Sequence, residues 1–560
     1  MSLKAHEHPL KKIFSADFDF AIPDYQRPYA WGTEQALQLL DDLEDALDQG
    51  STEPYFLGSL VLVKPDENQP AAQVIDGQQR LTTLSILFAL LRDLAEKPDA
   101  QVVLGDMVLE PGVALDGILP KPRLRLRPQD SGFFAAHVQT PGRFDGLLTL
   151  SDHALATDSQ RAIRDNAKAL RGRLSAWTDE KRSALAGLAR NRTFLVVVST
   201  PDLASAHRIF SVMNARGLDL EPSDIFKSDV IGAVDPSRKV EYARTWETAE
   251  QNLGRKPFAD LFLHLRTIVA KTRGQRELLI EFPQQVLNAY LESGRATDFI
   301  DDMLIPYATA YSHVLNRDYD QHDPAWRKVN NWLQRLSQLD NNDWRPPAMW
   351  ALKNHDNDPQ FLDVFLRRLE RLAASMLLRR VYTTPRVTRY IDLLRHLDGG
   401  AGVKAVAFDL SPDERQETRE QLAGELYKAL PVRKYVLLRL DELLANAPGV
   451  SYEHKIISIE HVLPQKPRSD SQWLKDFSDN ERAFWTHRLG NLLLLNRSKN
   501  GQAQNYDFAT KKEKYFGVAA GVTGFALTTT VVTEPVWTPE VVERRQTEFT
   551  AALIKEWELD

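Results

Sequence analysis

Apolar and polar positions along the first 90 residues follow the two periods expected of strands and helices. The runs DFDFAIP (17–23), YFLGSLVLVK (55–64) and QVID (73–76) have the composition of short strands. Between and after them, segments 33–50 and 81–90 repeat leucine at helical spacing, which predicts two helices. Because strands and helices alternate in this way, the first region is predicted to form an α/β or α+β unit.

The patterning changes twice farther along the chain, and the changes predict its domain organisation. Strand-like segments at 121–128 and 191–200, separated by a helical segment at 159–190, are followed by amphipathic helices with aromatic anchors. The order strand, loop, strand and helix then returns at 451–516, and a last helix begins at Pro539. We therefore predict an α+β multidomain protein with a first domain, a helical connecting region and a second domain, at residues 1–235, 236–445 and 446–560.

Composition narrows the class of protein. The 560 residues exceed what one hydrophobic core supports, and contents of 43% apolar and 26% charged residues are ordinary for a soluble protein. The chain has no cysteine, which excludes disulfides, thiolate zinc sites and cysteine nucleophiles and fits a reducing compartment. No apolar run approaches the roughly 18–20 residues that span a bilayer, so we expect a cytoplasmic protein without membrane contact. A net charge of −7 argues against a uniformly basic nucleic-acid binder but leaves local basic patches open.

The polar run DGQQR (76–80) stands where a predicted strand turns into a helix. Unpaired backbone N–H groups and the helix dipole favour an anion at such a position. Arg80 suits a phosphate, whereas Asp76, Gln78 and Gln79 suit a sugar, a base or a water molecule. A polar strand-to-helix turn without any ligand is equally compatible with these residues.

Two further polar motifs belong to the same region. In IPDYQRPYAWG (22–32), the residues Tyr25, Gln26 and Arg27 stand between two prolines that stiffen the backbone. Such a rigid loop can stack a base or a guanidinium group and can hold a phosphate. The third motif, NARGLDLEPSDIFKSD (214–229), joins the end of one predicted helix to the start of the next.

The order of these motifs, IPxYQRxYxW, DGQQRLTTL and MNxRGLxLxxSDxxK, resembles the N-terminal domain of GmrSD-type modification-dependent restriction enzymes. Related phosphorothioation-sensing and phage-exclusion nucleases share the pattern, and the resemblance covers residues 10–235. It implies a ParB/sulfiredoxin-like fold that binds and hydrolyses a nucleoside triphosphate, namely GTP, ATP or CTP. No P-loop is present. The nucleotide site that the resemblance implies comprises Tyr25, Gln26, Arg27, Asp76, Gly77, Gln78, Gln79 and Arg80.

A second group of polar residues lies in KIISIEHVLPQ (455–465) and LGNLLLLNRSKNGQAQNYDFATKKEKYF (489–516). The pattern predicts a strand that carries Glu460 and His461, a loop, a second strand opened by Asn491, and then a helix from about Ser498. This order is what a ββα-metal nuclease requires. In such a nuclease a neutral imidazole activates water and a hard cation stabilises the charge on the phosphate.

The same stretch resembles the HNH domain of the GmrSD family. The match implies that His461 is the general base, that Asn491 fixes the loop behind it, and that Glu460 and Asn500 bind Mg²⁺ or Mn²⁺. Glu460 stands where the family often has aspartate, and Asn500 replaces the last histidine of the HNH pattern. The absence of cysteine rules out the zinc-knuckle version of this fold.

Other basic side chains and histidines lie outside these motifs, and some of them have two interpretations. Residues 361–396 are rich in arginine, which fits either solvated helix faces or a surface that tracks DNA. His454 copies the Glu-His pair of the second strand segment and is expected to be a surface residue. His487 either touches DNA or supports the loop, and we do not include it among the catalytic residues. Three lysines after the second strand are expected to meet DNA phosphates, namely Lys511, Lys512 and Lys514.

Together with the residues above, the resemblance implies a cytoplasmic HNH endonuclease with NTPase activity that restricts modified phage DNA in the manner of type IV restriction enzymes. Its partners would be double-stranded DNA, a nucleoside triphosphate and a divalent metal ion, and a homodimer is one assembly open to it. The alternative is a nucleotide-dependent switch that binds DNA or a protein partner and keeps its HNH unit only as a scaffold.

Overall fold

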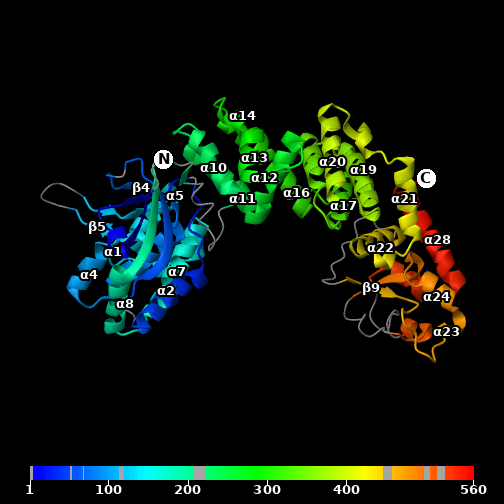
Figure 1. The fold of residues 1–560 in the computed structure, drawn as a ribbon, viewed down its shortest axis with the longest axis horizontal. Helices are drawn as coiled ribbons and strands as arrows, with labels where there is room; N and C mark the ends of the chain where they lie inside the picture. Colours follow the sequence, from blue (N-terminus) through cyan, green and yellow to red (C-terminus); the bar gives the residue numbers. More distant parts are fainter. Residues whose placement is uncertain are drawn as a thin grey trace. The chain divides into compact units, whose positions relative to one another are not determined.

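The computed structural model describes most of the chain, which divides into two compact units (Figure 1). The described residues are 4–24, 26–50, 53–66, 68–112, 119–202, 205–206, 221–445, 457–496, 505–513 and 524–560. The two units comprise Met1–Thr245 and Trp246–Asp560. The first is built on a mixed β-sheet and the second is mainly helical, which confirms the prediction of an α+β multidomain protein. The finer division into three parts stays a prediction.

The main sheet of the first unit has the strand order β1, β8, β3, β4, β2 and β7. These strands are β1 (Lys4–Pro9), β2 (Asp19–Ala21), β3 (Tyr55–Val63), β4 (Ala71–Asp76), β7 (Leu124–Arg125) and β8 (Thr193–Thr200). β3 is antiparallel to β4 and parallel to β8, while β2 is parallel to β4 and to β7. The strand predicted at 191–200 is thus confirmed as β8. The DGQQR segment begins at the last residue of β4, an interior strand of the sheet.

Two predicted segments of this unit are divided in the structure. Segment 121–128 forms β6 (Lys121–Pro122), which pairs with β5 (Leu109–Glu110), and β7 of the main sheet. Proline lacks the backbone N–H that would continue one ladder through this segment. The helical segment 159–190 forms two helices, because Thr178 accepts a hydrogen bond from the Lys181 backbone N–H (3.3 Å) and caps a new helix.

The helices of the first unit connect and cover these strands. They are α1 (Leu10–Ile13), α2 (Thr33–Asp48), α3 (Gln78–Leu94), α4 (Pro98–Gly105), α5 (Pro128–Phe134), η2 (Ala135–Gln139), α6 (Phe144–Leu148), η3 (Asp152–Ala154), α7 (Asp158–Ser175), α8 (Asp179–Arg192), α10 (Pro222–Ala233) and α11 (Lys239–Leu253), the last of which continues into the second unit. Helices α2 and α3 each contact α7 and α8, and the four helices share the main core with the sheet.

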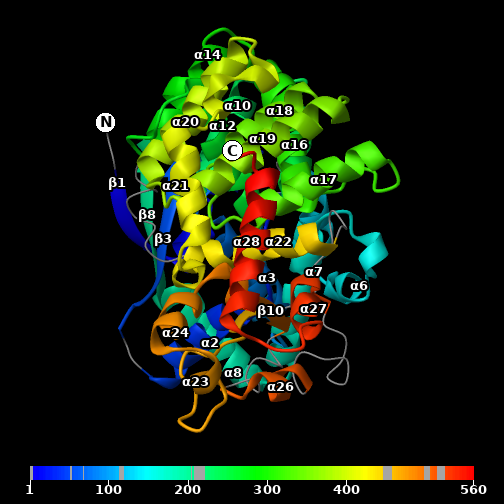
Figure 2. The same cartoon turned by 90° about the vertical axis from the view of Figure 1, so that its right-hand side faces the viewer.

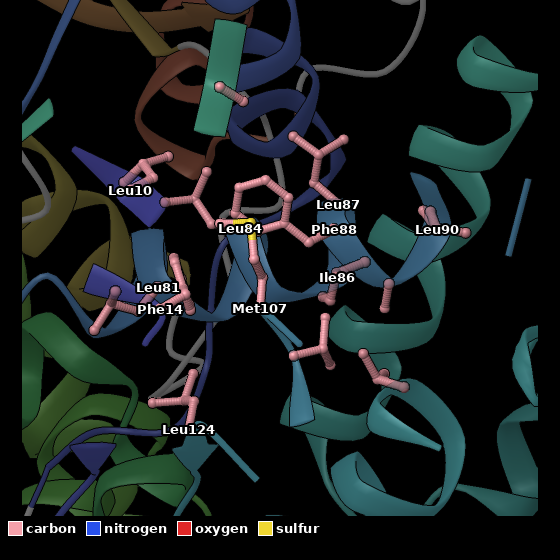
Figure 3. Packing of buried hydrophobic residues seen from close by; sticks show 14 of the residues in the cluster. Leu10, Phe14, Leu81, Leu84, Ile86, Leu87, Phe88, Leu90, Met107 and Leu124 are labelled. Atoms are coloured by element: carbon pink, nitrogen blue, oxygen red, sulfur yellow. The ribbon is translucent and has the colours of Figure 1, made fainter. Parts of the chain in front are cut away.

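Helix α3 is the centre of this core (Figure 3). Its side chains are buried almost all round, and Leu84 and Phe88 pack among Leu10, Phe14 and Met107. Such complete burial makes the helix rigid, because close-packed interiors leave side chains little freedom. The first turn of α3, which carries Gln78, Gln79 and Arg80 of the DGQQR segment, is therefore held in place by the core.

The helical part of the second unit is confirmed between the two motif regions. It contains α12 (Arg255–Ala270), α13 (Leu278–Phe282), η4 (Pro283–Leu287), α14 (Asn288–Leu291), α15 (Ala296–Asp298), η5 (Phe299–Leu304), α16 (Ile305–Asn316), α17 (Pro324–Ser337), α18 (Arg345–Asn354), α19 (Pro359–Leu378), α20 (Thr383–Asp398), η6 (Gly402–Lys404), η7 (Val406–Phe408), α21 (Pro412–Ala423), η8 (Leu426–Lys428) and α22 (Leu430–Ala445). No helix in the described ranges is long and apolar enough to cross a membrane.

The last part of the second unit is built around an antiparallel pair of strands. Its elements are β9 (Ile457–His461), α23 (Trp473–Asp476), α24 (Asp479–Trp485), η9 (Leu489–Asn491), β10 (Leu492–Asn496), α26 (Phe508–Lys511), α27 (Ala526–Val532) and α28 (Pro539–Glu556). The predicted last helix is confirmed as α28, which packs against η9, α21, α22 and α24 (Figure 2). The helix predicted from about Ser498 begins outside the described residues.

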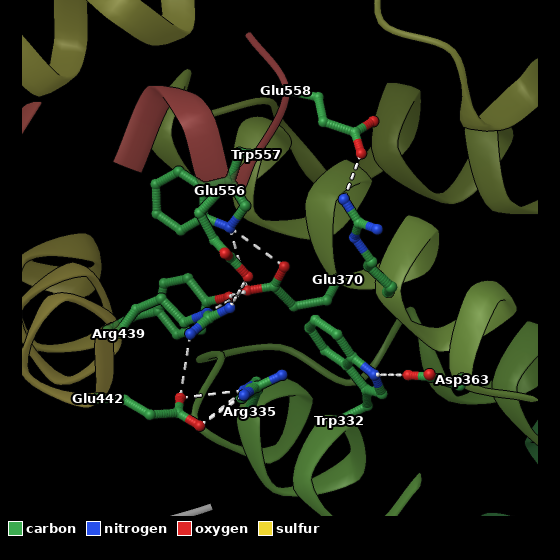
Figure 4. A network of polar contacts seen from close by, with 11 residues as sticks. Trp332, Arg335, Asp363, Glu370, Arg439, Glu442, Glu556, Trp557 and Glu558 are labelled. Atoms are coloured by element: carbon green, nitrogen blue, oxygen red, sulfur yellow. Dashed lines mark hydrogen bonds and ion pairs between the residues drawn. The ribbon is translucent and has the colours of Figure 1, made fainter. Parts of the chain in front are cut away.

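A buried network of charges joins the end of α28 to the helices before it (Figure 4). Arg439 on α22 donates to Glu370 on α19 (3.3 Å) and to Glu442 (3.1 Å), and Arg335 on α17 donates to the same Glu442 (2.6 Å). Trp557, which follows α28, donates through its indole N–H to Glu370 (3.1 Å). The C-terminal helix is thus anchored to the helical part of its own unit.

Most arginines of 361–396 form ion pairs with acidic side chains of the same unit. Arg371 pairs with Glu558 (2.5 Å), and Arg386 pairs with Asp343 (2.6 Å). Other arginines of the segment make similar pairs, namely Arg367, Arg368, Arg379, Arg389 and Arg395. Because these guanidinium groups already have acidic partners, the described structure favours solvated, ion-paired helix faces over a surface that tracks DNA.

Candidate functional site

The first two motifs of the N-terminal unit meet at the start of α3, where Gln79 joins them. Its Oε1 accepts hydrogen bonds from the backbone N–H groups of Ala30 (2.8 Å) and Trp31 (3.0 Å). Its Nε2 donates to the carbonyl oxygen of Pro28 (3.1 Å). Both ends of the amide are engaged by the loop 26–31, so Gln79 acts as a clamp on that loop. The structure thus corrects the prediction that the Gln79 side chain faces a nucleotide.

Two other glutamines of these motifs make the same kind of contact. Gln78 Nε2 donates to the carbonyl oxygen of Arg27 (2.6 Å), and Gln26 Nε2 donates to that of Ile75 (3.2 Å). Gln78 Oε1 is buried and accepts no hydrogen bond from any described residue. A buried polar atom without a partner is costly, so this oxygen is available to a ligand or a water molecule.

Asp76 and Arg80 form the charged part of the site. Arg80 Nη1 donates to the carbonyl oxygen of Ser59 (2.8 Å). Burial raises the pKa of Asp76. Three neighbouring groups oppose that rise, namely Arg80, the backbone N–H of Gly77 and Arg27. Gly77 has φ of +95°, a left-handed conformation that favours glycine at this turn.

This arrangement is able to bind an anion at one end of a helix. Helix α3 begins after Gly77 without a side-chain cap, so no side chain occupies its first N–H groups, and Arg80 lies in the first turn of the same helix. Asp76 supplies one negative charge beside them. Tyr25 and the first part of the third motif, residues 214–220, lie outside the described residues.

The C-terminal candidate site is organised by Asn491, a fully buried residue of η9. Its Oδ1 accepts from the Leu463 backbone N–H (2.8 Å), and its Nδ2 donates to the carbonyl oxygens of Leu463 (3.0 Å) and Thr486 (2.9 Å). Leu463 follows His461 closely in the sequence, and Thr486 directly precedes His487. One amide therefore fixes the backbone beside both imidazoles, which is the loop-fastening role predicted for Asn491.

The turn that carries Asn491 is in turn held by α28. The Gly490 backbone N–H donates to Gln546 Oε1 (2.8 Å), and Arg545 Nε donates to the Gly490 carbonyl oxygen (3.1 Å). A Cβ added at Gly490 would lie 2.5 Å from the carbonyl oxygen of Val542, which is too close for any side chain. The last helix of the chain thus holds the turn that carries Asn491 in position.

His461 ends β9 and lies among other side chains. It is 5% exposed, and its ring centroid is 4.1 Å from that of Tyr427. Its Nε2 lies 3.4 Å from His487 Nδ1, and its Nδ1 lies 3.3 Å from Gln465 Nε2. Both ring nitrogens therefore have a hydrogen-bond partner from the protein.

The surroundings of His461 keep its imidazole neutral. Burial is the largest cause, and together with the nearby His487, Lys511 and Arg433 it lowers the pKa of His461 to about 3. Burial also lowers the pKa of His487. A neutral imidazole has one nitrogen with a free lone pair, which a general base needs in order to take a proton from water.

Lys511 lies inside the site instead of on a surface that faces DNA. Its side chain is fully buried, and Nζ donates to Glu460 Oε1 (3.1 Å) and to the carbonyl oxygens of His461 (2.8 Å) and Val462 (3.1 Å). These contacts leave the ammonium group no access to a DNA phosphate, which corrects the prediction for Lys511. Burial raises the pKa of Glu460 and lowers that of Lys511, and each charge opposes the shift of the other.

Glu460 is the predicted metal ligand that the structure describes, because Asn500 lies outside the described residues. Lys511 contacts Oε1 of Glu460, and the backbone N–H of His461 also hydrogen-bonds this carboxylate. A carboxylate oxygen is a hard donor of the kind that Mg²⁺ and Mn²⁺ prefer. Within the described ranges no group of three or more histidine, aspartate or glutamate side chains is placed to hold a metal ion.

The remaining predicted basic side chains are only partly described. Lys512 Nζ donates to the carbonyl oxygen of Glu534 (2.7 Å), and its side chain is half-buried. Lys514 and His454 lie outside the described residues. A role for Lys512 and Lys514 in DNA binding stays a prediction.

Sequence reasoning missed Tyr427 and left His487 outside the catalytic set. Tyr427, in η8, lies with its ring 5.5 Å from that of His487 at 17°, and Arg433 lies 4.3 Å over the tyrosine ring. The Tyr427 backbone N–H donates to the carbonyl oxygen of His487 (3.0 Å). No local pattern marks Tyr427, since only the fold brings it to His461. For His487 the available signal was its place directly before the turn that carries Asn491.

Two family models match the chain. Residues 10–231 match the N-terminal domain of the GmrSD restriction endonucleases, and residues 412–552 match the C-terminal domain of the same enzymes. The first match contains the DGQQR segment and the loop that it holds. The second contains His461 and Asn491 and begins before Tyr427. No curated protein matches the chain.

Proposed function

The chain belongs to the GmrSD restriction endonucleases, whose two domains it carries, and we propose that it is a nucleotide-regulated, metal-dependent enzyme that cleaves modified foreign DNA. Membership of the family makes it a phosphodiester hydrolase with DNA as substrate. The proposal adds HNH-type chemistry at His461, a divalent metal ion, a nucleoside triphosphate in the first unit, and selection of modified double-stranded DNA such as that of phages.

One observation carries the proposal for cleavage, namely the environment of His461. The imidazole is neutral, lies at the end of a strand, and is backed by a loop that Asn491 fastens through its side-chain amide. Glu460 lies beside it on the same strand and is oriented by Lys511 (3.1 Å). A base, a carboxylate and a rigid loop are the protein groups that hydrolysis of a phosphodiester requires.

In the proposed reaction, His461 takes a proton from a water molecule as the water oxygen attacks phosphorus. A bond forms between that oxygen and phosphorus, and the bond from phosphorus to the leaving deoxyribose oxygen breaks. The leaving oxygen keeps the electron pair of that bond and takes a proton from solvent. Asn491 keeps the loop behind His461 from shifting, so the base stays aligned with the water. Lys511 holds the Glu460 carboxylate and the backbone of the same strand in place.

Glu460 and Asn500 are the residues that would hold the metal ion, with Glu460 Oε2 as the oxygen outside the Lys511 contact. When bound, a divalent ion stabilises the negative charge on the phosphate and on the leaving oxygen. Glu460→Gln should therefore raise the Mg²⁺ or Mn²⁺ concentration needed for cutting. An unchanged metal titration in this variant would place the ligands elsewhere.

We propose that the nucleotide binds at the N-terminus of α3, among the charged residues around it. Arg80 and the first N–H groups of α3 would meet phosphate, Asp76 and Gln78 Oε1 would meet the sugar or base, and the loop that carries Arg27 would cover them. Gln79 contributes indirectly by clamping the loop. Calorimetric titration with GTP, ATP and CTP should show affinity about tenfold or more weaker for Arg80→Ala. Wild-type protein that binds none of them would contradict the nucleotide proposal.

The experiment that tests cleavage is incubation of the full chain with supercoiled plasmid and Mg²⁺ or Mn²⁺. Unmodified plasmid is compared with DNA that carries sugar-modified bases and with DNA that carries phosphorothioate linkages. We expect one of the modified DNAs to be cut faster than the unmodified one, and chelation to stop the reaction. If all substrates stay intact with either metal ion, the alternative of a nucleotide-dependent binding switch is favoured.

A further inference from the structure

Two imidazole rings meet in the candidate active site, and the proposed reaction uses only one of them. His461 Nε2 lies 3.4 Å from His487 Nδ1, and the ring centroids are 5.4 Å apart at 76°. At the other ring nitrogen, Gln465 Nε2 lies 3.3 Å from His461 Nδ1. His487 is half-buried, whereas Gln465 is exposed. Nδ1 of His461 therefore contacts the exposed side chain of Gln465, whereas Nε2 contacts the more buried side chain of His487.

Hydrogen-bond chemistry selects one tautomer of His461 in this arrangement. The amide nitrogen of Gln465 can only donate, so His461 Nδ1 must offer its lone pair to it. A neutral imidazole then carries its proton on Nε2. This Nε2–H then faces Nδ1 of His487, 3.4 Å away, which accepts it when the proton of His487 lies on its other ring nitrogen.

We propose that His487 is a positioning residue that holds His461 in the tautomer whose Nδ1 is the basic atom. The inference rests on the proposed function of His461 as the general base and adds which of its two nitrogens takes the proton. Gln465 marks the place of the attacking water, because its exposed amide now occupies the lone pair that the water would use. This side chain must leave the lone pair before a water molecule can use it.

The two rings are held together by the backbone as well as by their own contact. Asn491 Nδ2 donates to the carbonyl oxygen of Thr486, the neighbour of His487, and also to that of Leu463 in the loop after His461. Tyr427 lies against both rings, and its ring centroid is 4.1 Å from that of His461 and 5.5 Å from that of His487. These contacts restrict both imidazoles, so the acceptor stays opposite the Nε2–H group.

The contact matters most after His461 has taken its proton. The imidazolium then carries N–H groups on both nitrogens, and its side chain is almost entirely buried. Its Nε2–H keeps an acceptor in His487, so no buried donor is left unpaired. Without that acceptor, the other tautomer becomes accessible, in which Nδ1 already carries a proton and cannot take one from water.

Two nearly isosteric variants separate this role from simple packing. In His487→Asn the side-chain oxygen can replace the Nδ1 acceptor, whereas in His487→Leu no acceptor remains. With saturating DNA, His487→Leu should lower kcat about tenfold to a hundredfold with little change in KM, and His487→Asn should retain most of the activity. The measurement is steady-state cleavage by the full chain of the plasmid that wild type cuts fastest.

Nitrogen NMR of ¹⁵N-histidine-labelled full chain reports the tautomer directly, with the His461 resonances assigned by their absence from His461→Ala. Wild type and His487→Asn should show a protonated Nε2 and a bare Nδ1, and His487→Leu should show a mixture. A proton on Nδ1 of His461 in wild type would overturn the proposal, and this holds even if the leucine variant does not fold.

Activity data distinguish failure of this inference from failure of the proposed function. Equal kcat in the leucine and asparagine variants, with His461→Ala inactive, would contradict the positioning role and leave His461 as the base. If His461→Ala cleaves DNA at the wild-type rate, the proposed function itself is contradicted.

Discussion

Gln79 in the first unit and Asn491 in the second do the same physical job at two unrelated sites. Each is a buried primary amide that uses its oxygen and its nitrogen to hold a neighbouring stretch of backbone. Their surroundings differ. Asn491 holds the segments that carry two neutral imidazoles, whereas Gln79 holds a loop beside the charged groups of Asp76 and Arg80.

The comparison teaches that a polar motif combines residues of two kinds. The amides give the site its shape, and their loss should appear first as lost stability. The imidazole or the charged groups beside them carry the chemistry, and their loss should appear as lost activity in a folded protein. The predictions below separate the two kinds of residue, beginning with the largest expected effect.

Replacing the base in the second unit should have the largest effect on activity and almost none on folding. His461→Ala should reduce DNA cleavage by about 10²–10⁴-fold, because a general base contributes that much to a proton transfer. Plasmid cleavage and thermal unfolding are measured side by side. His322→Ala, which alters an exposed histidine of the same unit, is the matched control and should be silent. Cleavage by His461→Ala within a few-fold of wild type would remove His461 from the reaction.

Replacing the amide of the second unit should cost stability and activity together. Asn491→Leu removes three hydrogen bonds of a fully buried side chain and leaves the N–H and C=O groups of Leu463 unpaired, which should destabilise this region by about 4 kcal/mol. Hydrogen exchange measured by mass spectrometry should show faster exchange in β9, β10 and η9. Unchanged protection there would mean that Asn491 is not the clamp.

The matching change in the first unit should be milder. Gln79→Leu also removes three hydrogen bonds, but the loop that it holds is partly exposed, so water can replace some of them and the expected loss is about 2 kcal/mol. Urea unfolding of the variant, followed together with nucleotide titration, checks this. If Gln79→Leu is as stable as wild type yet binds no nucleotide, Gln79 is a ligand residue and the comparison with Asn491 fails.

The smallest effect concerns acid stability, which should depend on a buried histidine of the second unit. Burial lowers the pKa of His264 to about 3, and Nε2 has no hydrogen-bond partner among the described residues. Between pH 6.5 and 3 the unfolded chain therefore binds a proton that the folded chain does not. Stability should fall on acidification through this range by about 1.4 kcal/mol per pH unit. Urea unfolding at pH 6.5 and 5.5 should show this extra loss in wild type and not in His264→Phe.

Much of the local structure is predictable from the sequence because its causes are local. β8 and α28 follow from periodicity and from Pro539 at a helix start. Segment 121–128 was wrong as a single strand, since Pro122 interrupts the ladder. The helical prediction for 159–190 is confirmed, but the break between its two helices at the cap Thr178 was not predicted.

The candidate sites were predictable in part for the same reason. His461 and Asn491 stand in a compact motif whose spacing reflects one strand pair and its loop. The interior position of Lys511 and the contact of Tyr427 with His461 were not predictable, because each depends on packing between segments that are distant along the chain. The roles of Gln78 and Gln79 were missed because a glutamine that holds backbone and one that holds a ligand look alike in sequence.

The most direct measurement is the cleavage rate per folded molecule for His461→Ala and Gln79→Leu, determined on the same preferred plasmid with Mg²⁺ or Mn²⁺ and with nucleotide at saturation. The folded fraction of each full-chain variant is taken from its own urea unfolding curve. We expect His461→Ala to be fully folded and inactive, and Gln79→Leu to be less stable but to cut at close to the wild-type rate per folded molecule. The opposite result, with His461→Ala active and folded Gln79→Leu inactive, would contradict the assignment of the chemistry to the C-terminal site.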